Sequence, residues 1–131
     1  MTDRELFSLA VAVKVRSYSP YSGFAVGAAL LCADGTVYTG SNIENASYTP
    51  TVCAERVAFF KAVSEGKRDF TAIAVAGGES DTTCPPCGVC RQVMAEFCTA
   101  DFAVVLSDGN GGTQRYTLAQ LLPFRFPADN L

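Results

Sequence analysis

Two cysteines, Cys87 and Cys90, stand three residues apart at the start of a segment that the sequence predicts to be helical. Two thiolates at this spacing suit one zinc ion. The backbone N–H groups and the positive end of the helix dipole stabilise thiolates at a helix N-terminus, which favours metal binding at neutral pH. A redox pair has the same spacing, so the pair by itself indicates either a metal site or a thiol redox site.

A third thiol, Cys53, begins another segment predicted to be helical, and Glu55 follows it within the first turn. Two helix N-termini can converge on one metal ion. Three thiolates leave the fourth zinc position open for water, which makes a site catalytic rather than structural. Zinc lowers the pKa of such a water from about 16 toward 7, and Glu55 would carry its proton. This arrangement predicts one Zn²⁺ per chain on Cys53, Cys87 and Cys90.

The same side chains have plainer roles that the residue types alone leave open. Cys84 could complete a closed structural site of four cysteines, in a module that binds a partner and leaves Glu55 idle. Glu55 could complement a helix dipole at the surface, and Cys53 could pack as a small apolar side chain. Arg56 could be a solvated charge. If zinc binds three thiolates, we infer that Arg56 and the two helix ends offset their excess negative charge.

Composition narrows the class of protein. The length of 131 residues favours a single domain over residues 1–131, and the absence of histidine leaves sulfur and carboxylate as metal ligands. Ten basic against 13 acidic residues, with no basic run longer than Lys67–Arg68, argue against a nucleic-acid substrate. Residues 1–16 mix charged and apolar side chains, unlike a signal peptide or a membrane span. We therefore expect a cytoplasmic protein with no membrane partner and no disulfides.

The elements that must position these residues alternate along the chain. Helices are predicted where apolar residues recur at helical spacing, over residues 3–16, 52–65, 88–97 and 118–122. Strands are predicted where apolar or β-branched runs are short, over residues 24–32, 36–41, 71–76, 102–106 and 114–117. Asp34-Gly35 predicts a hairpin between the first two strands. This order predicts a three-layer α/β/α fold around a mixed sheet of about five strands.

The combination Cys53-Ala54-Glu55 followed by Pro86-Cys87-x-x-Cys90 resembles the signature of the cytidine deaminases, in the small-subunit form that uses only thiolates. The resemblance extends over residues 19–30, 41–48 and 121–126. It implies a three-layer cytidine deaminase-like fold and hydrolysis of cytidine and deoxycytidine to uridine, deoxyuridine and ammonia in pyrimidine salvage. In that reaction zinc delivers hydroxide to the amine-bearing ring carbon, and Glu55 moves protons to the ring nitrogen and the leaving amine.

The resemblance also assigns residues to the substrate. Asn42 and Glu44 would hold the ribose 3′-hydroxyl, Phe24 would lie against the pyrimidine ring, and the backbone near Ala54 would hold the amide face of the base. Without the resemblance, Phe24 would be an ordinary core residue, and Asn42 and Glu44 would be part of a polar turn. In the implied homotetramer, the residues that help complete a neighbouring subunit's site are Ala46, Tyr48 and Phe126.

The sequence differs from the family pattern at two places, and two other kinds of substrate have to be considered. Val89 stands where the family often has alanine, and Cys84 with Pro85 adds a thiol just before the motif, but neither change removes a ligand. A related deaminase that acts on an antibiotic such as blasticidin S would use the same zinc chemistry. The block Asn42-x-Glu44-Asn45 favours a simple nucleoside instead. A polynucleotide is disfavoured, because a pair that holds a free 3′-hydroxyl excludes a continuing strand.

Overall fold

A five-stranded mixed sheet forms the centre of the molecule. The structure, a computed structural model, describes residues 1–79 and 81–126. The strands are β1 (Val26–Cys32), β2 (Val37–Ser41), β3 (Phe70–Gly77), β4 (Ala103–Ser107) and β5 (Thr113–Thr117). They lie in the order β2-β1-β3-β4-β5, with β3 and β4 parallel and every other neighbouring pair antiparallel. The predicted mixed sheet is confirmed, and the structure supplies the strand order, which the sequence pattern left undetermined.

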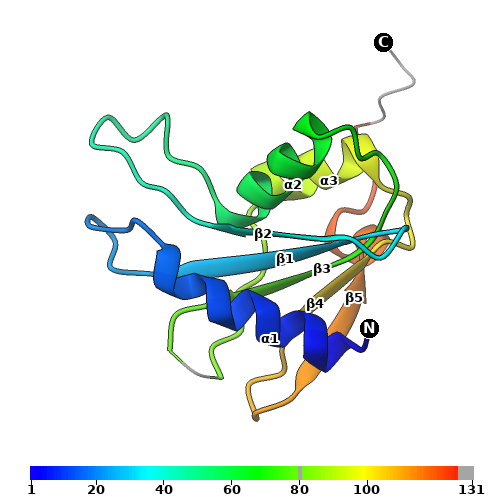
Figure 1. The fold of residues 1–131 in the computed structure, drawn as a ribbon, viewed down its shortest axis with the longest axis horizontal. Helices are drawn as coiled ribbons and strands as arrows, with labels where there is room; N and C mark the ends of the chain where they lie inside the picture. Colours follow the sequence, from blue (N-terminus) through cyan, green and yellow to red (C-terminus); the bar gives the residue numbers. More distant parts are fainter. Residues whose placement is uncertain (80, 127–131) are drawn as a thin grey trace.

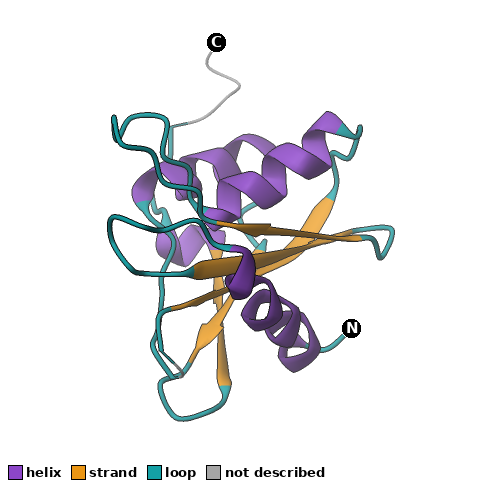
Figure 2. Ribbon diagram, turned by 60° about the vertical axis from the view of Figure 1, so that its left-hand side comes forward, coloured by secondary structure: helices purple, strands orange, loops and turns teal. Residues whose placement is uncertain are grey.

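Helices cover both faces of this sheet. They are α1 (Asp3–Val13), which continues as the 3₁₀ turn η1 (Lys14–Arg16), α2 (Ala54–Ser64), α3 (Gly88–Phe97) and the short α4 (Leu118–Leu121). Helix α1 lies against one face, and α2 and α3 lie side by side against the other (Figures 1 and 2). The predicted three-layer α/β/α fold is confirmed, and each predicted element agrees with an observed one to within two residues, apart from the 3₁₀ end of the first helix.

Two apolar clusters join the layers. On one face, Leu6 of α1 packs against small side chains of the sheet, among them Ala29 of β1. On the other face, Leu30 of β1 packs with Phe59 of α2 and Met94 of α3. Successive residues of β1 thus contribute to opposite clusters, as the two-residue period of a strand requires. No helix within the described part of the chain has the length and apolar character to cross a bilayer.

Gly40 of β2 determines how closely α2 approaches the sheet. A Cβ atom at this position would lie 2.6 Å from the carbonyl oxygen of Ala54 and 2.7 Å from the backbone nitrogen of Ala58. Both are backbone atoms of the first turns of α2, so neither can move without shifting the helix. The N-cap of this helix is Cys53, and its first turn holds Glu55. Gly40 therefore determines how far Cys53 and Glu55 lie from the sheet.

We expect Gly40→Ala to lower the free energy of unfolding by ~2–3 kcal/mol, because the added methyl group overlaps backbone atoms in a packed layer. The matched control is Gly88→Ala, where a Cβ atom meets nothing within 4 Å. Urea unfolding of both variants measures the difference. Equal unfolding midpoints for Gly40→Ala and the wild type would show that α2 is free to move away from the sheet.

Candidate active site

Three cysteine sulfurs meet where the N-termini of α2 and α3 converge. Cys53 is the N-cap of α2, Cys87 is the N-cap of α3, and Cys90 lies in the first turn of α3. The Sγ atom of Cys87 lies 3.7 Å from that of Cys53 and 3.5 Å from that of Cys90. All three sulfurs lie within 4.8 Å of one another. The structure thus brings together the three thiols that the sequence proposed as ligands.

The spacing of these sulfurs fits a zinc ion. Tetrahedral coordination at a Zn–S distance of about 2.3 Å places two sulfurs about 3.8 Å apart. The separations of 3.7 and 3.5 Å that Cys87 makes with Cys53 and Cys90 are close to this value. All six cysteines of the chain are free thiols in this structure. Val89, between two of the ligands, is 57% exposed, so its branched side chain does not obstruct the sulfurs.

Cys84 lies outside this cluster. Its Sγ atom packs against β3, where a Cβ atom at Gly77 would lie 2.6 Å from it. Burial above all, with the negative charges of Glu55 and Cys53, raises the pKa of the Cys84 thiol to about 11. The arrangement therefore favours an open site of three thiolates over a closed site of four.

The thiols of the cluster influence one another's ionisation. A hydrogen bond from Cys90, together with Arg56, lowers the pKa of Cys53 to about 5 against the opposing effect of burial. The Nη2 atom of Arg56 lies 3.4 Å from the Cys53 sulfur. The same hydrogen bond, followed by burial, raises the pKa of Cys90. A cation held between the sulfurs offsets the repulsion among thiolates, so the cluster is suited to bind one.

Glu55 is nearly fully buried beside these thiols, with 4% of its surface exposed. Burial above all, with the negative charge of Cys53, raises the pKa of its carboxyl group to about 7, against the opposing effects of a backbone hydrogen bond and of Arg56. A carboxyl group with a pKa near neutrality can both accept and donate a proton at physiological pH. Its position and its ionisation both suit a proton carrier.

A pocket of about 280 Å³ opens above Glu55. It contains all of the residues to which the sequence assigned the substrate, namely Phe24, Asn42, Glu44 and Ala54. The ring of Phe24 packs against the end of β3, where a Cβ atom at Gly78 would lie 2.7 Å from its Cε1 atom. The structure therefore joins the β1–β2 region and the two helix N-termini in a single cavity.

Asn42 has a structural role that the sequence did not predict. Its Oδ1 atom accepts hydrogen bonds from the Ser17 hydroxyl at 2.5 Å and from the Val26 N–H at 2.9 Å. Its Nδ2 atom donates to the Phe24 carbonyl at 2.9 Å. Asn42 therefore holds the segment that carries Phe24, and one of its two Nδ2 hydrogens is left for a further acceptor.

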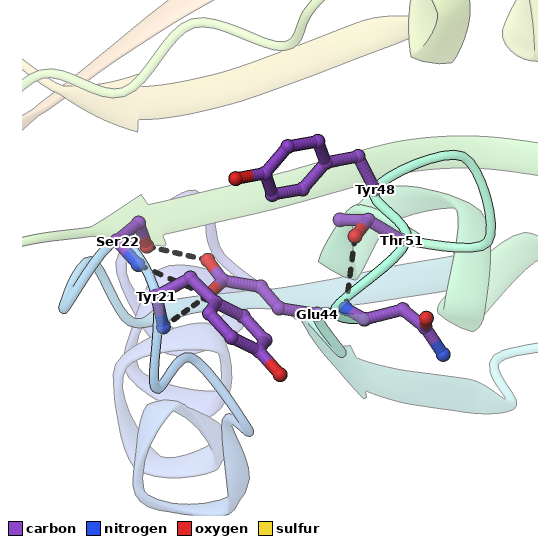
Figure 3. A pocket seen from close by; sticks show the side chains of 6 residues that line it. Tyr21, Ser22, Glu44, Tyr48 and Thr51 are labelled. Carbon is purple, nitrogen blue, oxygen red and sulfur yellow. Dashed lines mark hydrogen bonds between the residues drawn. The ribbon is translucent and has the colours of Figure 1, made fainter.

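A second pocket, of about 430 Å³, adjoins the first and shares Glu44 with it. Its lining comprises Tyr21, Ser22, Glu44, Asn45, Tyr48 and Thr51 (Figure 3). Of the residues predicted to serve a neighbouring subunit, Tyr48 lines this pocket, whereas Ala46 and Phe126 are exposed and line neither pocket. The sequence interpretation did not assign a role to Tyr21 and Ser22, because their contacts with Glu44 join residues more than 20 positions apart.

The site combines three thiols at a spacing that fits a metal ion with a buried carboxyl group that lines a pocket. This combination is typical of a zinc-dependent hydrolase. Residues 1–106 match the family described as "Cytidine and deoxycytidylate deaminase zinc-binding region". A cytidine deaminase of Halalkalibacterium halodurans is 52% identical over 130 residues, which cover 98% of each chain. One of Sporosarcina psychrophila is 53% identical and covers 88% of this chain and 85% of its own.

Comparison of the fold with solved structures indicates the same family. The crystal structure of a cytidine deaminase from Burkholderia pseudomallei matches with a TM-score of 0.89 and 44% identity, covering 96% of this chain and 100% of the other. The chain therefore belongs to the zinc-binding cytidine and deoxycytidylate deaminase family.

Proposed function

We propose that this chain hydrolyses cytidine and deoxycytidine to uridine and deoxyuridine, with release of ammonia. The observation that carries the proposal is the placement of Glu55, buried at the floor of a pocket and beside three thiols whose spacing fits zinc. The relatives named above, which are cytidine deaminases, support the choice of substrate.

Each residue of the metal site has a distinct task. Cys53, Cys87 and Cys90 would hold zinc, which would act as a Lewis acid and lower the pKa of a water molecule toward about 7. Glu55 takes the proton of the attacking water, passes it to the ring nitrogen and then carries a proton to the departing amine. Its pKa of about 7 makes both protonation states accessible at neutral pH. Arg56, 3.4 Å from the Cys53 sulfur, offsets part of the negative charge of the thiolates.

The remaining pocket residues bind the nucleoside. Phe24 faces the pyrimidine ring, the backbone at Ala54 contacts the amide face of the base, and Asn42 and Glu44 bind the 3′-hydroxyl of the sugar. The Asn42 side chain has a donor left for this purpose, and the Glu44 carboxylate has an acceptor position left. A donor and an acceptor together suit a hydroxyl group, which can accept one hydrogen bond and donate another.

This assignment predicts a preference for free nucleosides. A contact with a free 3′-hydroxyl is lost when that oxygen is esterified in a strand, so kcat/KM for cytidine should exceed that for an internal cytosine of a single-stranded oligonucleotide by at least about 10³-fold. Ammonia release from both substrates at equal cytosine concentration measures the ratio, with blasticidin S as a third substrate. Comparable rates on the oligonucleotide would contradict the role of Asn42 and Glu44, and faster turnover of blasticidin S would favour the antibiotic.

We further propose that the whole chain, residues 1–131, forms one domain and that four copies assemble into a homotetramer in the cytoplasm, where the enzyme serves pyrimidine salvage. Large apolar side chains that a single chain leaves exposed support the assembly, among them Val15 (86%), Tyr48 (75%) and Phe126 (60%). In the assembly, the residues that complete a neighbouring site are Ala46, Tyr48 and Phe126.

A further inference from the structure

Ser22 connects the two parts of the pocket that the proposed function assigns to the base and to the sugar. It lines both the 280 Å³ and the 430 Å³ cavities. Its hydroxyl donates a hydrogen bond to Oε2 of Glu44 and accepts one from the backbone N–H of Phe24 at 3.0 Å. Figure 3 shows the Ser22 side chain and backbone N–H directed at the Glu44 carboxylate. One side chain thus contacts both the carboxylate assigned to the sugar and the residue assigned to the base.

The direction of these hydrogen bonds is determined by the groups involved. The Phe24 N–H can only donate, so it takes one acceptor position of the Ser22 oxygen. The Ser22 proton then points to the ionised carboxylate of Glu44, which can only accept. Donor and acceptor in such a chain polarise each other, so each bond strengthens the other. Removal of the Ser22 hydroxyl would break both bonds at once.

Hydrogen-bond donors occupy most of the acceptor positions of the Glu44 carboxylate, and Ser22 provides two of the three donors. Oε1 accepts the backbone N–H groups of Tyr21 at 3.0 Å and Ser22 at 3.1 Å, and Oε2 accepts the Ser22 hydroxyl. A carboxylate offers about four acceptor positions, so one position on Oε2 is left. The hydrogen bond from the Ser22 hydroxyl is the main reason why the pKa of Glu44 is lowered, which keeps this carboxylate ionised.

The backbone of Phe24 is held on both sides. Ser22 binds its N–H, and the amide of Asn42 binds its carbonyl oxygen at 2.9 Å. The ring is 40% exposed and lines the pocket together with Glu55. Removal of the Ser22 hydroxyl would leave the Asn42 bond to Phe24 in place, so the Glu44 carboxylate would lose more support than the Phe24 ring.

We propose that Ser22 is a positioning residue that holds the Glu44 carboxylate and the Phe24 backbone in fixed positions relative to each other. It acts on the substrate chiefly through the contact of Glu44 with the sugar 3′-hydroxyl. The proposal rests on the proposed function. It distinguishes Ser22 from a residue that merely stabilises the loop, because its effect depends on a hydroxyl group of the substrate.

The test compares cytidine with 3′-deoxycytidine, using zinc-loaded wild type, Ser22→Ala and Ser22→Thr. Ser22→Ala should raise KM for cytidine about tenfold with kcat within about twofold of the wild type, because the sugar contact is made equally in the ground state and the transition state. With 3′-deoxycytidine the same variant should change KM by less than about twofold, since the contact is absent in both enzymes. Ser22→Thr, which retains the hydroxyl, should restore KM for cytidine.

The control is Ser8→Ala, which removes a hydroxyl that donates to the Arg4 carbonyl at 2.9 Å within α1, on the helix that lies outside the pocket lining. It should match the wild type on both nucleosides. Equal losses on cytidine and 3′-deoxycytidine for Ser22→Ala, or no loss on either, would overturn the role of Ser22 while leaving the deaminase activity established. A wild-type protein that deaminates neither nucleoside would overturn the proposed function itself, and the role of Ser22 with it.

Discussion

Glu55→Gln is expected to lower kcat for cytidine by about 10³-fold or more, near the upper end of what a positioned acid or base contributes, while one zinc ion per chain stays bound. Glutamine has nearly the same shape as glutamate, so the packing beside the thiols is retained. It cannot accept the proton of the water or return it to the ring and the amine. The loss should therefore appear in kcat, with little change in KM.

The control for this variant is Glu96→Gln, which makes the same chemical change at an exposed position of α3. Steady-state kinetics and zinc analysis on the same preparations separate chemistry from metal binding. If Glu55→Gln retained a tenth or more of the wild-type kcat, Glu55 would not be the proton carrier. If it lost zinc, the carboxyl group would be part of the metal site instead.

Cys90→Ser should abolish both zinc binding and turnover. Its sulfur is buried, with 1% of the residue exposed, and it lies 3.5 Å from the Cys87 sulfur. A serine hydroxyl does not ionise at neutral pH, so two thiolates would remain to hold the metal. We expect the zinc content to fall from one ion per chain to near zero after dialysis against a weak chelator. The midpoint of thermal unfolding should fall toward that of the metal-free wild type, because the bound metal stabilises the folded state.

Cys84→Ser provides the matched comparison, because the same atom is replaced in a neighbouring thiol that lies outside the cluster. It should retain one zinc ion per chain. Loss of zinc from Cys84→Ser but not from Cys90→Ser would indicate that the metal is held by a different set of sulfurs. Loss from both would restore the closed four-cysteine site as the better description.

The elements of this fold follow from local patterns, whereas their arrangement does not. Leu30 and Ala29 point to opposite faces because a strand has a period of two, and that period is visible in the sequence. The order β2-β1-β3-β4-β5 depends instead on which strands meet through long-range packing. The proximity of Gly40 to the backbone of α2 is of the same kind, since nothing local marks this glycine as a packing contact.

The residues of the site also fall into those that local sequence predicts and those that it does not. The Cys87 and Cys90 pair was predictable because both lie at the start of one helix, and Cys53 and Glu55 were added as possible partners because they begin a second helix. The resemblance to a family signature then selected this combination over the plainer roles of each residue. The sequence left the role of Cys84 open, and the structure places it outside the metal cluster. Ser22 was missed because its partner Glu44 lies 22 positions away, beyond the reach of any spacing rule.

The most direct test of the account is the ultraviolet absorbance of cytidine incubated with the purified protein, with zinc determined on the same sample. We predict complete conversion to uridine by a protein that holds one zinc ion per chain, and loss of conversion when a strong chelator removes the metal. Bound zinc without any change in absorbance would contradict the proposed substrate. Conversion that persists in a metal-free sample would contradict the central claim that three thiolates and Glu55 form a zinc-dependent catalytic site.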